Sequence, residues 1–155
     1  MAGRYWLVKS EADVYSIDNL KMDGVTPWDG VRNYEARNIM RDGMKDGDLV
    51  LYYHSNASPP GVAGVARVEG EPYPDPTQFQ PKSPYHDPKS DPDDPRWILV
   101  DLAFVEKLPG LVSLQEIRET EGLQEMTLLK RMRLSVQDVR EEEFHLILER
   151  GRSDG

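Results

Sequence analysis

The chain has 155 residues, the common length of a single domain, and its 38% hydrophobic and 30% charged residues are typical of a globular protein with one core. It contains no cysteine, which excludes disulfides, thiolate nucleophiles and cysteine-ligated metal sites. The net charge of −9 argues against a protein that coats nucleic acid through long-range attraction.

The charge is distributed unevenly, and no segment resembles a membrane span or a signal peptide. Lys130, Arg131 and Arg133 lie together with no acid between residues 127 and 135, so a locally basic face is compatible with the acidic total. No run approaches the ~18 apolar residues of a span, and residues 1–6 lack the apolar core of a signal peptide. We expect a monomeric cytoplasmic protein without membrane contact, with one domain over residues 1–151 and a flexible tail at 152–155.

The first third of the chain predicts strands and helices whose ends are marked by capping residues. The predicted segments are a strand at Tyr5–Val8, a helix from Ser16 to Asp23, a helix from Asn33 to about Asp42, and a strand at Leu49–His54. Ser16 and Asn33 are placed as N-caps, and Gly24 and Gly43 are placed as stops. Both strands end in polar residues, so we expect groups that can bind a ligand at the strand tips.

The rest of the chain alternates less regularly between strands and helices. The predicted segments are a strand at Gly61–Val68, a loop at Glu71–Pro95, a strand at Trp97–Val105, a helix from Leu114 to about Glu121, helical turns at Thr127–Arg133, a strand at Leu134–Val136, and a helix at Glu141–Glu149 that Gly151 ends. The loop holds eight prolines and several acids without the spacing of a calcium loop, so we interpret it as a solvated loop. The whole pattern favours an α+β fold, in which a mixed, mostly antiparallel sheet of five or more strands curls into a small barrel decorated by short helices.

Catalytic constellations are weak in this sequence. The three histidines, His54, His86 and His145, lack the spacing of a metal site, so we expect neither a metal nor another cofactor. Ser10 or Ser55 could form a triad with His54 and an aspartate, but these residue types are common and their placement is not specific. We therefore expect a protein that is not an enzyme. The alternative is an enzyme that acts on nucleotides with His54 as acid or base.

The stretch from Pro27 to Asn38 concentrates groups that bind a flat ligand. Trp28 lies outside the predicted strands, before an Asp-Gly turn, where a tryptophan often presents a ring face. Each residue also has an ordinary interpretation: Trp28 as a core residue, Asn33 as a helix cap, and Arg32 and Arg37 as solvated surface. Together they supply a stacking surface, an amide for a base edge and cations for phosphates, which recognition of a single nucleobase requires.

Five blocks of the sequence resemble the EVE domain family, including its stand-alone bacterial members. They are Tyr5–Glu11, Trp28–Asn38, Tyr53–Asn56, Tyr73–Pro76 and Ser135–Gln137, and the resemblance extends from Tyr5 to about Gly151. The family belongs to the PUA-like superfamily, so the resemblance implies a pseudo-barrel of five to six strands with short helices. Ala12 and Asp138 depart from the pattern, because both stand where the family usually has proline.

The resemblance also implies a pocket for a modified nucleobase, such as a modified cytosine in DNA. Modified RNA bases are the rival ligand, and a sensor of modified nucleotides is a further alternative. The residues implied to contact the base are Ser10, Trp28, Asn33, Tyr53, Ser55 and Gln137. The residues implied to lie at the pocket mouth or on phosphates are Lys9, Arg32, Arg37, His54 and Arg133. Asp138 would weaken phosphate contact at the mouth.

Overall fold

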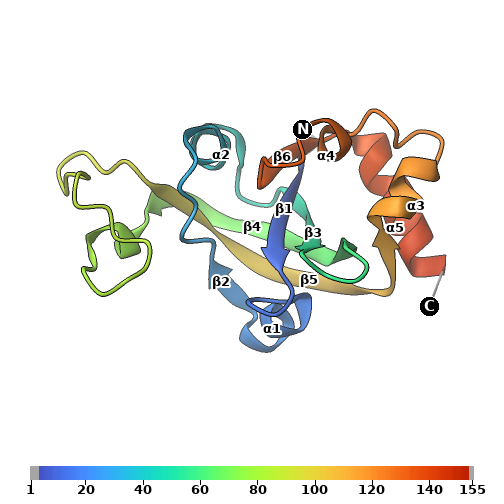
Figure 1. The fold of residues 1–155 in the computed structure, drawn as a ribbon, viewed down its shortest axis with the longest axis horizontal. Coiled ribbons are helices and arrows are strands. Elements are labelled where there is room, and N and C mark those ends of the chain that lie inside the picture. The colour runs from blue at the N-terminus through green and yellow to red at the C-terminus, as the bar shows by residue number, and fades with distance from the viewer. Residues whose placement is uncertain (1–3, 154–155) are drawn as a thin grey trace.

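The computed structural model describes residues 4–153 as a six-stranded sheet with short helices around it (Figure 1). The strands are β1 (Tyr5–Glu11), β2 (Val25–Pro27), β3 (Leu49–Ser55), β4 (Gly61–Pro74), β5 (Ile98–Ser113) and β6 (Val136–Val139). Their order is β2-β5-β4-β3-β1-β6, with β1 parallel to β3 and the other neighbouring pairs antiparallel. The α+β class and the mixed, mostly antiparallel sheet are confirmed. The sheet is open, however, with β2 and β6 at its edges, and does not close into a barrel.

The helices are short, and side chains that the sequence marks as caps fix where they begin. They are α1 (Ile17–Asp23), α2 (Tyr34–Asn38), a π-helical turn (Ile39–Gly43), a 3-10 turn (Pro76–Phe79), α3 (Leu114–Glu119), α4 (Thr127–Lys130) and α5 (Glu141–Ser153). Ser16 Oγ accepts a hydrogen bond from Asn19 N (3.2 Å), and Asn33 Oδ1 accepts one from Ala36 N (2.9 Å). Both predicted N-caps are confirmed, since each satisfies a first-turn N–H that has no partner inside its helix.

The sheet carries a buried core on each face, and the alternation of side chains along β3 assigns residues to the two. Val50 and Tyr52 belong to one core cluster, and Leu51 and Tyr53 belong to the other. Helices α1 and α2 pack on the first cluster, and α3, α4 and α5 pack on the second. Figure 1 shows α3 and α5 together at one end of the molecule and the proline-rich segment that precedes β5 at the other.

Several strand boundaries differ from the prediction. Strands β4 and β5 continue to Pro74 and Ser113, because they keep pairing with each other beyond the apolar runs that end at Val68 and Val105. The edge strand β2, which pairs antiparallel with β5, is too short to leave a pattern in the sequence. Strand β6 begins at Val136, so Ser135 lies in the loop before it.

The C-terminal helix is longer than predicted. Gly151 does not end the helix but lies within α5, which runs to Ser153. An ideal Cβ on Gly151 would lie 2.7 Å from Leu108 Cδ1, so glycine at this position allows α5 to pack against β5. Of the expected tail, Arg152 and Ser153 are helical, and residues 154–155, like residues 1–3, lie outside the described part of the chain. Within residues 4–153, no helix has the length and apolar character needed to cross a membrane.

Candidate functional site

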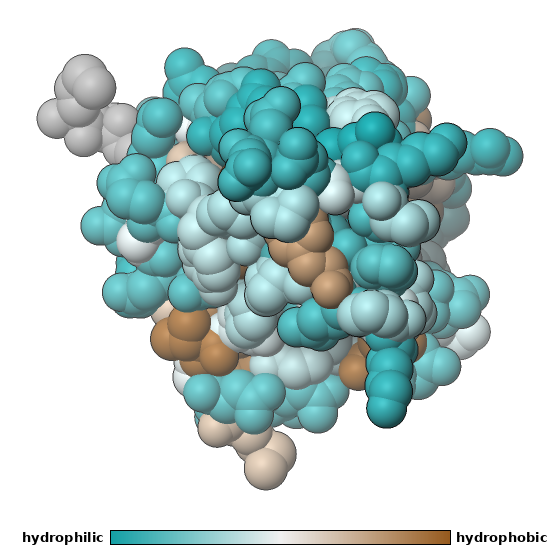
Figure 2. Space-filling model, turned by 90° about the vertical axis from the view of Figure 1, so that its left-hand side faces the viewer, coloured by the Kyte–Doolittle hydropathy of each residue, from teal (hydrophilic) through white to brown (hydrophobic). Residues whose placement is uncertain are grey.

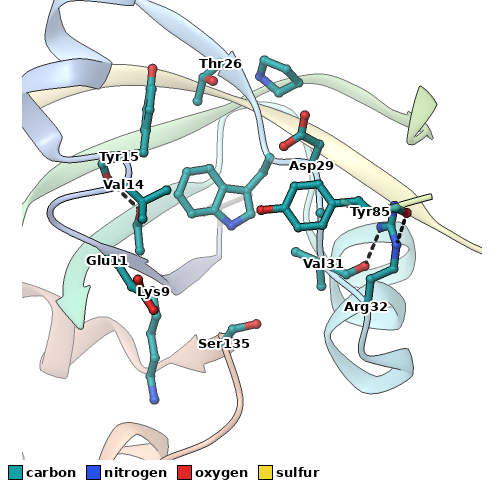
Figure 3. Close-up of a pocket in the computed structure, with 14 residues that line it drawn as sticks. Lys9, Glu11, Val14, Tyr15, Thr26, Asp29, Val31, Arg32, Tyr85 and Ser135 are labelled. Carbon is teal, nitrogen blue, oxygen red and sulfur yellow. Dashed lines mark hydrogen bonds between the residues drawn. The ribbon is translucent and has the colours of Figure 1, made fainter. Parts of the chain in front are cut away.

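A cleft of about 530 Å³ opens beside the core cluster that α1 and α2 cover (Figure 3). Its walls come from the end of β1, the turn before α1, strand β2 and the residues 28–32 that follow it. Tyr85 and Ser135 reach the cleft from distant parts of the chain. This volume lies in the ~300–1,000 Å³ range of small-ligand sites. Among residues 4–153, no group of three or more His, Asp or Glu is placed to hold a metal ion.

Trp28 belongs both to the core and to the cleft. Its ring packs edge-on against buried Tyr52, with centroids 5.5 Å apart and an interplanar angle of 78°. Its backbone N–H donates to Val100 O (2.9 Å), which fixes the main chain at the end of β2. The side chain is half-buried and lines the cleft. The two interpretations of Trp28 are therefore compatible, because the ring packs against the core at Tyr52 and its remaining exposed surface borders the cleft.

Lys9 and Ser10 line the cleft at the tip of β1, where the sequence places them. Ser10 Oγ donates to Tyr15 O (2.7 Å), which leaves its lone pairs available to accept a hydrogen bond. Lys9 Nζ donates to Met132 O and lies 5.8 Å from the centroid of the Tyr53 ring. Burial lowers the pKa of Lys9 from its ordinary value.

Arg32 lines the cleft, but its guanidinium is bound to the protein itself. It forms an ion pair with Asp75 (3.1 Å) and donates to Thr77 Oγ1 (3.1 Å) and to Tyr85 O (2.6 Å). Burial raises the pKa of Asp75, but hydrogen bonds from Thr77, Gly30 and Arg32 outweigh that effect and hold the pKa below its ordinary value. Arg32 therefore joins the proline-rich segment to the cleft wall, a role that its interpretation as a phosphate contact does not include.

The proline-rich segment is anchored over its length. Gln78 Nε2 donates to Asp75 O (2.7 Å) and Trp97 O (2.8 Å), while its Oε1 accepts from Trp97 N (3.1 Å) and Ser90 Oγ (2.6 Å). Its outer surface is largely hydrophilic, as expected for a solvated loop (Figure 2). The buried Gln78 nevertheless shows that the segment has an ordered interior.

Tyr85 is the part of this segment that reaches the cleft (Figure 3). Its ring occupies the space beside Gly30, where an ideal Cβ would lie 2.6 Å from Tyr85 Cζ. Gly30 has φ +81°, a left-handed conformation that glycine adopts without strain. The Asp-Gly turn thus serves both to bend the chain after Trp28 and to admit Tyr85.

Two residues implied as site contacts, Asn33 and Arg37, do not line the cleft. The side-chain oxygen of Asn33 caps α2 through Ala36 N. Arg37 Nη1 donates to Arg96 O (2.8 Å), and its guanidinium lies 4.8 Å from the centroid of the Tyr34 ring. These contacts hold α2 against the end of the proline-rich segment.

His54 and Ser55, at the end of β3, also lie outside the cleft lining. His54 Nε2 accepts a hydrogen bond from Ile17 N (3.1 Å), so it fixes the start of α1. Burial lowers the pKa of His54, with Asp18 and Lys107 acting in opposite directions. No hydrogen bond joins His54 to Ser10 or Ser55 in the described structure, so the imagined triad is not assembled.

Tyr53 and Gln137 are buried away from the cleft. Tyr53 belongs to the core cluster on the opposite face of the sheet from Tyr52, as alternation along β3 requires. Gln137 Nε2 donates to Arg131 O and Leu134 O (both 2.8 Å), and its Oε1 is buried without a hydrogen-bond partner among the described residues. Gln137 therefore shapes the loop that carries Ser135 to the cleft.

Arg133, on that same loop, is exposed and forms no ion pair within residues 4–153. Its neighbours in sequence differ: Lys130 pairs with Glu125 (2.6 Å), and Arg131 pairs with Glu35 (2.6 Å). Most of the basic charge that the sequence gathers in this region is thus neutralised locally, and Arg133 remains available to an anion.

Asp29 and Tyr85 line the cleft but are absent from the predicted site. In the sequence, Asp29 and Gly30 together indicate a turn. The position of Asp29 next to Trp28 was the signal that could have identified it as a site residue. Tyr85 lies in a segment whose composition indicates only a solvated loop, and nothing in the sequence places it beside Gly30.

Comparison with known proteins identifies the family of this chain. Thymocyte nuclear protein 1 of Mus musculus is 42% identical over 93% of this chain and 72% of its own length. A hypothetical protein from Leishmania major has a TM-score of 0.94 and 44% identity, covering 98% of this chain and 96% of that one. The structure of human THYN1 protein in complex with 5-methylcytosine-containing DNA has a TM-score of 0.89 and 39% identity, covering 96% of this chain and 98% of that one. The sequence model of the EVE domain matches residues 4–150, and the chain therefore belongs to the EVE domain family.

Proposed function

We propose that this EVE domain is a non-catalytic reader that binds DNA carrying a modified base, with 5-methylcytosine as the first candidate. A structural neighbour at 39% identity, human THYN1, is in complex with DNA that contains this base. The observation on this chain that carries the proposal is Trp28, which is half-buried in a cleft with the volume of a small-ligand site.

Stacking on Trp28 is the main expected interaction with the base. A base inside a duplex is inaccessible, so a reader of this kind accepts a base that is flipped out or single-stranded. Stacking on an aromatic side chain contributes ~1–3 kcal/mol per base. The edge contact with Tyr52 and the backbone bond to Val100 hold the indole in place before the ligand arrives, which reduces the entropy lost on binding.

The apolar part of the cleft offers a place for the 5-methyl group. Val14, Pro27 and Val31 line the cleft close to Trp28 in sequence or in space. Burial of one methyl group contributes ~0.8 kcal/mol, which corresponds to a preference of about fourfold for the methylated base.

Electrostatic attraction to the DNA backbone is expected to be modest. The net charge is −9. Within residues 4–153, only two cations on or near the cleft wall form no ion pair: Lys9, which lines the cleft, and the exposed Arg133, two residues before Ser135. Selectivity should therefore depend on the pocket more than on phosphate contacts.

The positions of the candidate catalytic groups favour a reader over an enzyme. His54, which would be the acid or base in the alternative, accepts from Ile17 N and does not line the cleft. Ser10 lines the cleft but donates its proton to Tyr15 O and not to a histidine.

Fluorescence anisotropy with a labelled oligonucleotide that contains one 5-methylcytosine tests the role of Trp28. Trp28→Ala should weaken binding by about 5- to 150-fold, the range that the loss of one stacked base implies. Trp28→Phe keeps an aromatic face and should retain most of the affinity. Circular dichroism of each variant checks that it is folded. Equal affinities for folded Trp28→Ala and wild type would refute the proposed site.

A further inference from the structure

We propose that Asp29 makes the cleft selective for a cytosine ring over thymine by accepting a hydrogen bond from the exocyclic amino group of the bound base. This inference rests on the proposed function of the cleft and specifies how its polar wall acts.

Asp29 is placed to meet a ligand that stacks on Trp28. It follows Trp28 directly in the chain and lines the same cleft, and Figure 3 shows it on the same side of the cleft as Tyr85. The turn that it forms with Gly30 is fixed, because Gly30 N donates to Asp75 Oδ2 (2.9 Å) and the ring of Tyr85 packs on Gly30.

Two donors close to Asp29 in the chain, the guanidinium of Arg32 and the backbone N–H of Gly30, are already engaged by the proline-rich segment. Arg32 is bound to Asp75, Thr77 and the carbonyl of Tyr85, and the N–H of Gly30 is also used on Asp75. Within residues 4–153, the Asp29 carboxylate receives no hydrogen bond from another residue and forms no ion pair. Asp75, which is buried and does not line the cleft, is thus saturated with donors, whereas Asp29, which lines the cleft, is left as a free acceptor.

The electrostatic surroundings of Asp29 favour an incoming hydrogen-bond donor. Partial burial and repulsion from Asp75 raise the pKa of Asp29, and Arg32 offsets part of this rise. A carboxylate in this position gains stabilisation when a ligand brings an N–H group to it, because hydrogen bonds to charged groups are stronger than neutral ones.

An amino group is the feature that separates cytosine from thymine at this position. Cytosine presents the N4 amino donor where thymine presents the O4 acceptor, and a carboxylate accepts from the first and is repelled by the second. 5-Methylcytosine and thymine both carry the 5-methyl group, so an apolar contact with the methyl cannot distinguish them. Asp29 supplies the distinction that methyl recognition lacks.

Two single-stranded oligonucleotides that differ only at one central position, 5-methylcytosine or thymine, test this role without a difference in unpairing cost. Wild type should bind the 5-methylcytosine strand about tenfold more tightly. Asp29→Asn should bring the ratio close to one, because an amide can turn to donate to O4. Asp29→Ser, whose hydroxyl lies one bond closer to the backbone and can donate as well as accept, should also lose the preference.

Glu11→Gln is the matched control, because Glu11 also lines the cleft and its replacement removes the same charge. It should change the affinity for both strands by the same factor and leave their ratio intact. If Asp29→Asn and Asp29→Ser keep the wild-type ratio while Trp28→Ala loses binding, the role of Asp29 is overturned and the reader function stands. If wild type binds neither strand, the proposed function itself fails.

Discussion

Arg32→Ala should destabilise the fold substantially, because Arg32 joins the proline-rich segment to the cleft wall. The ion pair with Asp75 has an N–O distance of 3.1 Å and side-chain exposures of 22% and 2%. Removing one partner of a buried pair costs ~3–5 kcal/mol. Because Arg32 is partly solvated and Asp75 keeps its hydrogen bonds from Gly30 and Thr77, we expect a loss of ~2–3 kcal/mol in the free energy of unfolding.

Urea unfolding at pH 7 measures this loss, and Arg41→Ala is the matched control. Arg41 pairs with its neighbour Asp42, and the side chains are 44% and 61% exposed, so its loss should cost less than ~1 kcal/mol. The folded-state pKa of Asp75 is lowered, so its stabilisation is present above the unfolded-state pKa and is lost as the pH falls through the folded-state pKa. The difference in the free energy of unfolding between Arg32→Ala and Arg41→Ala should therefore become smaller in acid. Equal costs for both at pH 7 would contradict a structural role for Arg32.

Three further predictions address packing, buried charge and phosphate contact. Gly30→Ala should lower the free energy of unfolding by more than the ~1–2 kcal/mol that a left-handed φ costs a residue with a Cβ, because the new Cβ also meets Tyr85. In a Tyr85→Ala background, urea unfolding should show only the cost of the left-handed φ. Burial raises the pKa of Glu143 above 4.5, so the folded state loses stability as the pH rises above 4.5 and the carboxyl ionises. In urea unfolding, Glu143→Gln should therefore be more stable than wild type at pH 7 and no more stable at pH 4. Arg133→Ala should weaken binding equally for methylated and unmethylated oligonucleotides and reduce the salt slope of log K by ~1, as measured by anisotropy at several salt concentrations.

Local chemistry made part of the fold predictable. Ser16 and Asn33 cap their helices as expected, because a cap depends only on residues within one turn of it. The strands at Tyr5 and Leu49 were also identifiable, since buried strands leave a run of apolar and aromatic residues. Strand β2 and the far ends of β4 and β5 were not, because their existence depends on backbone pairing with a distant strand.

The same limit applies to the candidate site: a local pattern in the sequence places some of its residues, and the pairing of distant strands places the others. Trp28, Lys9 and Ser10 line the cleft, and their positions outside a strand or at its tip can be read from the sequence. Tyr53 and Gln137 point into the interior because the register of the sheet decides which face a strand residue occupies. A block of residues that resembles a family does not reveal this register.

Arg32 illustrates why residue type alone does not fix a role. An arginine beside a stacking aromatic suggests a phosphate contact, yet its fork fits Asp75 and the carbonyl of Tyr85. The partner lies more than forty positions away in a segment whose composition indicates only solvent exposure. Only the fold of that segment shows that Arg32, Gly30 and Tyr85 form one wall of the cleft.

Whether the cleft reads a modified base is measured most directly with two DNA oligonucleotides that differ by one methyl group. Anisotropy titration of wild type with 5-methylcytosine or cytosine at the same position should give a Kd at least about fourfold lower for the methylated strand. Trp28→Ala should weaken the binding of both strands. Equal Kd values for the two strands with wild type, or a methyl preference that persists in folded Trp28→Ala, would show that Trp28 and its cleft do not read the methylated base.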